Sequence, residues 1–395
     1  MIDFINESRN IFNYAQEKRR DFHRHPELGF KEIRTSKIIE KELQKLGLEV
    51  KPGIGGTGVI GLLEGYRKYP VVLLRFDMDA LPIQEENEVD YVSRNKGVMH
   101  ACGHDGHMAI GLSVAKLLSQ YKNEIPGTIK FVFQPAEEGL GGALAMIEGG
   151  VLKDPKPNYS LAMHLWNEEN IGWIGVTEGP AMAASETFNI HITGKGGHGA
   201  SPHQTVDPIY IAAQIINTLQ SIVSRNIDPL KTGVVSVTSV HGGDTFNVIP
   251  QYVELSGTIR TFDRETRELV LKRFKEIVRG IIKTFNAEVE ISIEDVTPAV
   301  INDEIVSKNI LQMARNLFPK YKVVNDVITM GSEDMAYMMK DIPGCYMFVG
   351  SSNPERGLTA KHHHPKFDFD EQALSIGTAL MSSAAILILG MEDNN

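Results

Sequence analysis

The order of the predicted strands and helices constrains the fold of this chain more than any other feature. Up to about residue 183, apolar strands alternate with helices, which is typical of an α/β layered domain. Residues 184–297 instead follow the order strand, helix, strand, strand, helix, strand, the split βαβ arrangement. The alternating pattern then resumes. We therefore predict an α/β fold in which a discontinuous larger domain, residues 1–183 and 298–395, carries a small ferredoxin-like domain inserted at 184–297.

Local periodicity supplies the expected elements. Predicted helices have apolar positions at helical spacing, and predicted strands are short apolar runs. In the larger domain we expect helices at 4–22, 33–47 and 108–121, and strands at 59–65, 71–77, 128–134 and 160–166. In the inserted domain we expect strands at 186–194, 232–242, 252–262 and 287–295, and helices at 206–225 and 265–285.

One stretch near the C-terminus could be mistaken for a membrane span. Residues 373–391 carry no charge and are nearly long enough to cross a bilayer. Serine, threonine and glycine dilute the stretch, and no basic flank marks an inside end. We therefore expect a buried core helix.

Charge and cysteine content exclude several kinds of protein. With 42% apolar and 23% charged residues, the chain has the composition of a globular protein. A formal net charge of -10 argues against nucleic acid or anionic membrane as a partner. The two cysteines, Cys102 and Cys345, cannot form a disulfide framework, and the charged N-terminal stretch has no apolar signal core. We therefore expect a cytoplasmic protein.

A glycine-rich segment resembles a dinucleotide-binding motif but lacks its context. GIGGTG, residues 53–58, fits the spacing G-x-G-x-x-G. Such a site needs a helix after the glycines, so that the helix N-terminus can hold pyrophosphate. Here a predicted strand follows instead. We expect a tight turn, and the chain contains neither a G-x-S-x-G elbow nor the zinc-deaminase signature.

The segment HACGHDGH, residues 100–107, has a composition that core packing does not require. Cys102 and His104 are two residues apart, so in extended backbone they project to one side. Thiolate and imidazole are both good ligands for metals such as zinc. The structural alternative is a helix start capped by Asp105, with a buried cysteine. For any one residue we favour the structural role, and for the cluster as a whole we favour a metal site.

Three further segments offer ligands at or near strand ends. In QPAEEG, Glu137 and Glu138 directly follow an apolar strand, where α/β sites form. One interpretation is that the two glutamates lie in a solvated loop. The other is that one glutamate coordinates metal while its neighbour transfers protons. His164 ends another apolar strand, and residues 361–369 contain three histidines before a proline. Together these segments could bind two ions, with a cysteine sulfur between them.

The inserted domain carries its own polar candidates. GKGGHGASPH, residues 194–203, sets a histidine in a glycine-rich loop that could reach an active site or serve as a flexible turn. FNVIP, residues 246–250, and the strand residue Arg260 could hold a substrate carboxylate, arginine through paired hydrogen bonds. Each signal alone is weak.

Taken together, these segments resemble a known enzyme family. They are FHRHPELGFKE (22–32), RFDMDALPI (75–83), MHACGHDGHM (99–108), QPAEEG, MHLW, GKGGHGASPH, FNVIP and HHPKFDFDE (363–371). In this order they resemble the amidohydrolase branch of the dinuclear metallo-aminoacylase/carboxypeptidase family, over nearly the whole chain. That branch includes N-acyl-amino-acid deacylases, hippurate hydrolases and indoleacetyl-amino-acid hydrolases. The resemblance implies a metallopeptidase-like catalytic domain with an inserted lid and dimerisation domain.

The resemblance also implies a metal-ligand set. Cys102 matches a ligand that bridges two divalent ions, and His104 and His164 match ligands of one ion. Glu138 and His363 match ligands of the other ion. The resemblance implies two ions, with zinc expected first and manganese, cobalt or nickel as alternatives for the same ligands.

Other positions match catalytic and binding residues of the family. Glu137 matches the general base, and His198 matches a histidine that polarises the scissile carbonyl across a dimer. Asn247 and Arg260 match substrate-binding positions, and Asp79 matches a carboxylate that orients a metal ligand. Asp105 and His107 are expected to support the ligands. His363 is chosen because the family's ligand lies two residues before the proline. His362 stands where the family usually has leucine.

We therefore expect a metal-dependent amidohydrolase that cleaves N-acyl-L-amino acids, with acetyl, benzoyl or a similar acyl group. One alternative is a metallocarboxypeptidase that releases C-terminal residues from short or N-blocked peptides. Another is a catalytically inactive metal-binding protein of the same fold, which would not require Glu137. The resemblance further implies a homodimer formed through the inserted domain.

Overall fold

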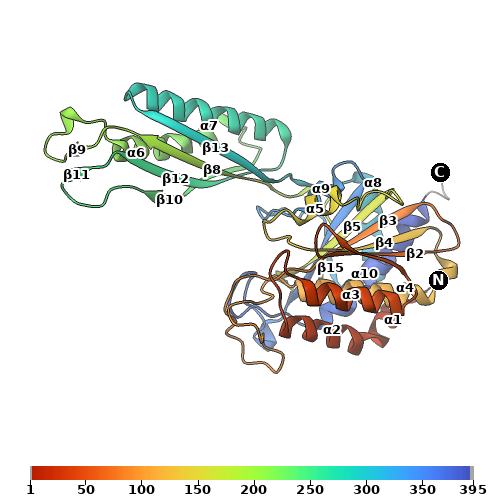
Figure 1. Ribbon diagram of the computed structural model, residues 1–395. Coiled ribbons are helices and arrows are strands. Elements are labelled where there is room, and N and C mark those ends of the chain that lie inside the picture. Colours follow the sequence, from red (N-terminus) through yellow and green to blue (C-terminus); the bar gives the residue numbers. More distant parts are fainter. Residues whose placement is uncertain (1, 392–395) are drawn as a thin grey trace. The chain divides into compact units, whose positions relative to one another are not determined.

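The computed structural model describes residues 2–391 and divides into two compact units (Figure 1). The first unit comprises the described residues of Met1–Ala181, Ile301–Ile328 and Asp334–Asn395. The second unit comprises Met182–Val300 and Thr329–Glu333. Each unit has its own hydrophobic core, so the two are described separately.

The first unit contains an eight-stranded sheet whose central strands are buried on both faces. Its order is β1 (Glu49–Ile54), β2 (Gly58–Glu64), β4 (Thr128–Gln134), β3 (Val71–Asp77), β5 (Tyr159–Asn170), β16 (Gly344–Ser352), β6 (Trp173–Gly175) and β15 (Lys322–Val324). β4, β3, β5 and β16 run parallel to one another, while β1 and β2 pair antiparallel. Nearly continuous apolar runs suit such buried parallel strands. The predicted α/β fold class is confirmed.

The helices of the first unit cover this sheet. They are α1 (Phe4–Asn10), α2 (Phe12–Arg24), α3 (Ile33–Lys45), α4 (His104–Gln120), α5 (Gly142–Glu148), α8 (Glu304–Leu317), α9 (Met335–Met339) and α10 (Gln372–Leu389), with 3-10 turns at Lys122–Glu124 and Pro354–Arg356. In Figure 1, α2 and α3 lie beside α4 on one side of the sheet, in agreement with the packing of α4 against both. The carboxylates of Asp3 and Asp303 cap the N-termini of α1 and α8.

Helix α10 is long and apolar enough to cross a membrane by length and composition alone. Within the described chain, however, most of it is buried, and it packs against α1, α2, α4 and α8 and against β5. The expectation of a core helix over residues 373–391 is confirmed for the helix that the structure describes.

Two predicted elements differ in detail from the observed ones. The helix expected at 4–22 is divided at Ile11, whose backbone leaves helical geometry (φ -101°, ψ 11°) although its side chain still packs against the hydrophobic core. The helix expected from residue 108 already begins at His104, because Gly103 at φ 87° lets the chain turn into α4 there. Within the GIGGTG segment, residues 55–57 form the tight turn of the β1–β2 hairpin, as expected.

The second unit is a four-stranded antiparallel sheet covered by two helices. Its strand order is β10 (Gly233–His241), β12 (Tyr252–Thr261), β8 (Ala184–Thr193) and β13 (Glu288–Thr297). The helices are α6 (Pro208–Ser221), continued by a π-helical turn at Ile222–Asn226, and α7 (Arg264–Thr284). The carboxylates of Asp207 and Asp263 cap α6 and α7. Along the chain the order is therefore β-α-β-β-α-β.

Short strands complete the structure. β9 (Gly197–His198) pairs with β11 (Val248–Ile249) in the second unit, close to a 3-10 turn at Pro202–Gln204. β7 (Gly179–Met182) pairs with β14 (Val300–Asn302). The β9–β11 pair joins two of the polar loops that the sequence analysis singled out.

Candidate metal centre

Four segments of the first unit meet near the carboxyl ends of its parallel strands. Cys102 and His104 lie at the start of α4, Glu138 follows β4, His164 lies on β5, and His363 lies in the loop before α10. Candidate ligand atoms of Cys102, His104 and His164 lie within 4.8 Å of one another, as do those of Cys102, Glu138 and His363. We call these five residues the metal-ligand cluster. The two groups share the cysteine sulfur.

The first group presents two imidazole nitrogens beside the sulfur. Cys102 Sγ lies 3.5 Å from His164 Nε2. His104 donates from Nδ1 to the Asp79 carbonyl oxygen at 2.9 Å, and His164 donates from Nδ1 to the Leu165 carbonyl oxygen at 2.6 Å. A proton on Nδ1 leaves the Nε2 lone pair free, and such backbone acceptors commonly fix the tautomer of metal-binding histidines. Both Nε2 atoms are therefore available as ligands.

The second group places a carboxylate between two histidines. Glu138 Oε1 lies 3.3 Å from His363 Nε2 and 4.0 Å from His104 Nε2. His363 has a left-handed backbone with φ 64°, and its N–H donates to the Ala101 carbonyl oxygen at 2.8 Å. This bond fixes His363 next to the segment that carries Cys102.

Unsatisfied polar atoms and local charge show that the cluster fits a divalent cation. His104 Nε2 and Glu138 Oε1 are buried, and neither atom has a hydrogen-bond partner among the residues that the structure describes. Burial and the nearby Glu138 charge raise the pKa of the Cys102 thiol. Polar contacts with the Cys102 sulfur and with Glu138 raise the pKa of His363 to about 10. A cation would satisfy the orphaned atoms and favour the thiolate, and this mixture of sulfur, nitrogen and oxygen donors suits zinc and similar metals.

Asp79 holds two members of the cluster. Its backbone carbonyl accepts the His104 Nδ1 proton, and its carboxylate Oδ2 accepts the Glu138 backbone N–H at 3.0 Å. The side chain is almost fully buried. One residue thus orients a ligand from each group.

Both ring nitrogens of His107 take part in hydrogen bonds next to the cluster, and His107 would lose one of these bonds if it bound a metal ion. Its Nδ1 lies 2.6 Å from Asp77 Oδ1, and its Nε2 accepts the Leu165 backbone N–H at 2.9 Å. Asp77 also binds Arg75 Nη1 at 2.7 Å. Burial opposes ionisation of Asp77, yet the neighbouring histidines and Arg75 hold its pKa well below the usual range. The only sign of this role in the sequence is the place of Asp77 in the RFDMDALPI segment.

Glu137 lies beside the cluster, on a turn that a hydrogen bond from Ala136 to Glu32 holds in place. Candidate ligand atoms of Glu137, Glu138 and His104 lie within 4.8 Å of one another. The turn begins at Ala136, which has φ 54° and whose N–H donates to Glu32 Oε1 at 3.0 Å. Glu32 in turn accepts the Thr57 hydroxyl at 2.6 Å. Glu32 was missed as a site residue, and its only signal was its place in the FHRHPELGFKE segment.

The three neighbouring histidines before Pro365 have different environments. His362 Nε2 accepts the Asn167 N–H at 3.3 Å, and its ring packs edge-on against His164 with centroids 5.0 Å apart. Burial and nearby histidines lower the pKa of His362 to about 3. His364 is exposed and accepts the Lys366 N–H. Of the three, His363 is the one in the cluster.

The remaining predicted residues lie in the second unit. His198 and Asn247 come together there, because His198 pairs with Val248 and the Asn247 carbonyl accepts the Gly199 N–H at 2.8 Å. His198 is exposed, and its Nδ1 accepts the Ala200 N–H at 3.0 Å. Arg260 lies on β12, and its guanidinium bonds to the Thr258 hydroxyl and to the Ile259 carbonyl without a carboxylate partner among the described residues.

Comparisons with known proteins identify the family. A family model described as peptidase family M20/M25/M40 matches residues 73–386. The chain belongs to this family. Its family-level activity, metal-dependent hydrolysis of amide or peptide bonds, agrees with the expectation from the sequence.

Three similar proteins illustrate the range of the family. N-acetylcysteine deacetylase of Bacillus subtilis is 40% identical over 94% of this chain and 96% of that protein. Thermostable carboxypeptidase 2 of Saccharolobus solfataricus is 39% identical over 96% of this chain and 97% of that protein. The solved structure of the Bacillus subtilis YxeP protein, described as a dinuclear metal binding peptidase, has a TM-score of 0.85 at 35% identity and covers 97% of this chain and 99% of that one.

Proposed function

We propose that this M20-family hydrolase cleaves the amide bond of N-acyl-L-amino acids, with two divalent ions held by the metal-ligand cluster. The observation that carries the proposal is the pair of ligand groups that share Cys102, with Glu137 beside them. Similarity to an N-acetylcysteine deacetylase supports the substrate class, and similarity to a dinuclear metal binding peptidase supports two ions. Zinc suits the mixed ligands best, and manganese, cobalt or nickel could occupy the same positions.

In the proposed reaction each of these residues has a separate role. Bound divalent ions lower the pKa of water and polarise a carbonyl oxygen. Glu137 accepts a proton from the attacking water and delivers it to the leaving amine, a role that contributes about 100- to 10,000-fold to such rates. His198 donates to the developing oxyanion. Asn247 and Arg260 bind the substrate carboxylate, and the absence of a described carboxylate partner leaves the Arg260 guanidinium ready for it.

A carboxypeptidase acting on short or N-blocked peptides is the second candidate. Similarity to a thermostable carboxypeptidase over nearly the whole chain favours it. Both reactions need amide hydrolysis beside a recognised carboxylate, so the same residues would serve either. An inactive metal-binding protein is disfavoured, because the family is one of peptidases and Glu137 is present.

A substrate screen of metal-stripped and reconstituted protein tests the proposal. N-acetyl amino acids, N-benzoyl amino acids and dipeptides would each be assayed with zinc, manganese, cobalt or nickel added back. We expect release of acetate or benzoate that chelator abolishes and metal restores. Faster cleavage of dipeptides would favour the carboxypeptidase, and metal binding without any hydrolysis would overturn both.

We further propose a cytoplasmic homodimer formed through the second unit. That unit exposes several apolar side chains near β10, β11 and β12, which favours a protein interface. They are Val240, Phe246, Val248 and Tyr252. Sedimentation analysis of wild type and Phe246→Ser would test the dimer, and a monomeric wild type would contradict it. Cell fractionation would test the compartment, for which the support is the content of only two cysteines, too few for a disulfide framework.

A further inference from the structure

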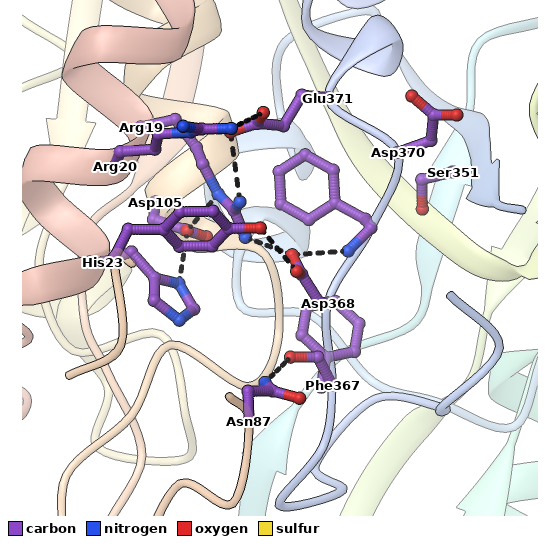
Figure 2. A network of polar contacts seen from close by, with 12 residues as sticks. Arg19, Arg20, His23, Asn87, Asp105, Ser351, Phe367, Asp368, Asp370 and Glu371 are labelled. Carbon is purple, nitrogen blue, oxygen red and sulfur yellow. Dashed lines mark hydrogen bonds and ion pairs between the residues drawn. The ribbon is translucent and has the colours of Figure 1, made fainter. Parts of the chain in front are cut away.

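A network of buried charges connects α2 with the first turn of α4 and with the segment before α10 (Figure 2), and the proposed reaction does not use it. Its centre is Arg19 on α2, whose side chain is fully buried. Nε binds Asp105 Oδ2 at 2.8 Å, Nη2 binds Asp368 Oδ1 at 2.6 Å, and Nη1 lies 3.3 Å from Glu371 Oε1. One guanidinium therefore contacts three carboxylates.

The three carboxylates come from two segments that carry metal ligands. Asp105 directly follows His104 in the first turn of α4. Asp368 and Glu371 follow His363 in the segment that leads into α10. Arg19 thus joins the segment of Cys102 and His104 to the segment of His363.

Neighbouring groups fix the guanidinium and its partners in one geometry. The Arg19 Cζ lies 4.7 Å from the Tyr91 ring centroid and 4.3 Å from that of Phe369. The Tyr91 hydroxyl donates to Asp368 Oδ2 at 2.7 Å, and His23 Nδ1 contacts Asp105 Oδ2 at 2.8 Å. Charged groups buried in this way are often no more stabilising than apolar ones, so stability alone does not account for the network.

We propose that Arg19 is a positioning residue that sets the affinity of the ion bound by Cys102, Glu138 and His363. This inference rests on the proposed two-ion function. The other ion depends less on Arg19, because the imidazoles of His104 and His164 are held by the carbonyls of Asp79 and Leu165. When the network is loosened, the segment that carries His363 can move relative to α4. This movement disturbs the set of Cys102, Glu138 and His363, because that set takes ligands from both segments.

Two conservative variants and one matched control test this role. Arg19→Lys keeps the positive charge but loses the guanidinium that contacts three carboxylates at once. Asp368→Asn removes the negative charge of the Asp368 side chain and keeps its shape. Arg20→Gln is the control, because Arg20 binds Glu371 through Nε at 2.8 Å and Nη2 at 2.7 Å without contacting Asp105 or Asp368. Folding is checked by near-ultraviolet circular dichroism and thermal unfolding. If Arg19→Lys does not fold, Asp368→Asn carries the test.

Cobalt(II) titration of the stripped proteins, with a competing chelator, gives stoichiometry and both affinities. The absorption of the cobalt–thiolate bond reports independently on Cys102. For both network variants we expect the ion bound by Cys102, Glu138 and His363 to lose about 10- to 100-fold in affinity. The affinity of the ion bound by His104 and His164, and the thiolate absorption, should stay unchanged. Arg20→Gln should keep both affinities.

The possible outcomes separate the two proposals. Folded network variants with wild-type affinities for both ions would overturn the role of Arg19, and so would equal weakening of both ions. Fewer than two ions in the wild-type protein would instead overturn the proposed function, and the Arg19 inference with it.

Discussion

Cys102 Sγ and His164 Nε2 lie 3.5 Å apart although their residues are 62 positions apart in the chain. The start of α4 and the strand β5 create this contact, and the same sulfur also belongs to the group with Glu138 and His363. A shared thiolate can hold two cations close together. The account of function depends on this sharing.

Replacing the shared sulfur tests the bridge. Cys102→Ser should impair binding of at least one ion, because a hydroxyl is a far poorer ligand than a thiolate for zinc-like metals. Metal analysis of the purified variant gives the stoichiometry. Cys345→Ser is the control, since Cys345 is buried on β16 outside both ligand groups. An unchanged metal content in Cys102→Ser would remove the bridging role.

Replacing the base should separate turnover from metal binding. Glu137→Ala should lower kcat by about 100- to 10,000-fold while metal content survives, because its role is proton transfer. Metal analysis and initial rates on the same sample test this. Glu138→Ala, which removes a proposed ligand, should lose metal. The opposite result for Glu137→Ala, lost metal with intact turnover, would contradict the assignment.

The turn that carries Glu137 should be intolerant of a side chain at one glycine. A Cβ on Gly142 would lie 1.7 Å from the Pro135 carbonyl oxygen, so the backbone around Glu137 must shift. We expect Gly142→Ala to cost at least about 1–3 kcal/mol and to lower kcat. At Gly139, with φ 75° and open space around it, Gly139→Ala should cost about 1–2 kcal/mol from backbone strain alone. Urea unfolding and initial rates compare the two variants, and an unchanged kcat in Gly142→Ala would contradict the steric argument.

His23 should make stability depend on pH. Its full burial opposes the charge, but Asp105 and Glu85 outweigh this and raise the pKa of His23 from 6.5 to about 9. The stabilisation is therefore complete below pH 6.5 and is lost as the pH rises through about 9. It amounts to about 3 kcal/mol at most.

Urea unfolding of wild type and His23→Gln at about pH 6 and about pH 10 measures this contribution. The gap in unfolding free energy between the two proteins should narrow at the higher pH. A gap that is independent of pH, or that widens, would show that His23 is not the charged partner of Asp105.

Much of the fold could be predicted because its signals are local. Apolar runs such as residues 71–77 and 128–134 and the periodicity of α7 depend only on neighbouring residues. The break at Ile11 could not be predicted, because neither proline nor glycine marks it.

The site was predictable in residue type more than in arrangement. Thiolate, imidazole and carboxylate indicated metal, but choosing His363 over His362 needed the resemblance, because both occupy one loop. Arg19 gave no sign of its role, since an arginine in a helical pattern usually lies on the surface, and Glu32 gave none beyond its place in the FHRHPELGFKE segment. Their burial results from contacts with residues far away in the chain, such as Asp368 and Ala136.

Anomalous X-ray diffraction at the absorption edge of the bound metal would show whether Cys102 joins two ions. We expect two peaks about 3.5–4 Å apart. The Cys102 sulfur should lie about 2.3 Å from each, with His104 and His164 on one ion and Glu138 and His363 on the other. A single peak, or two peaks that the Cys102 sulfur does not join, would contradict the bridging role of Cys102.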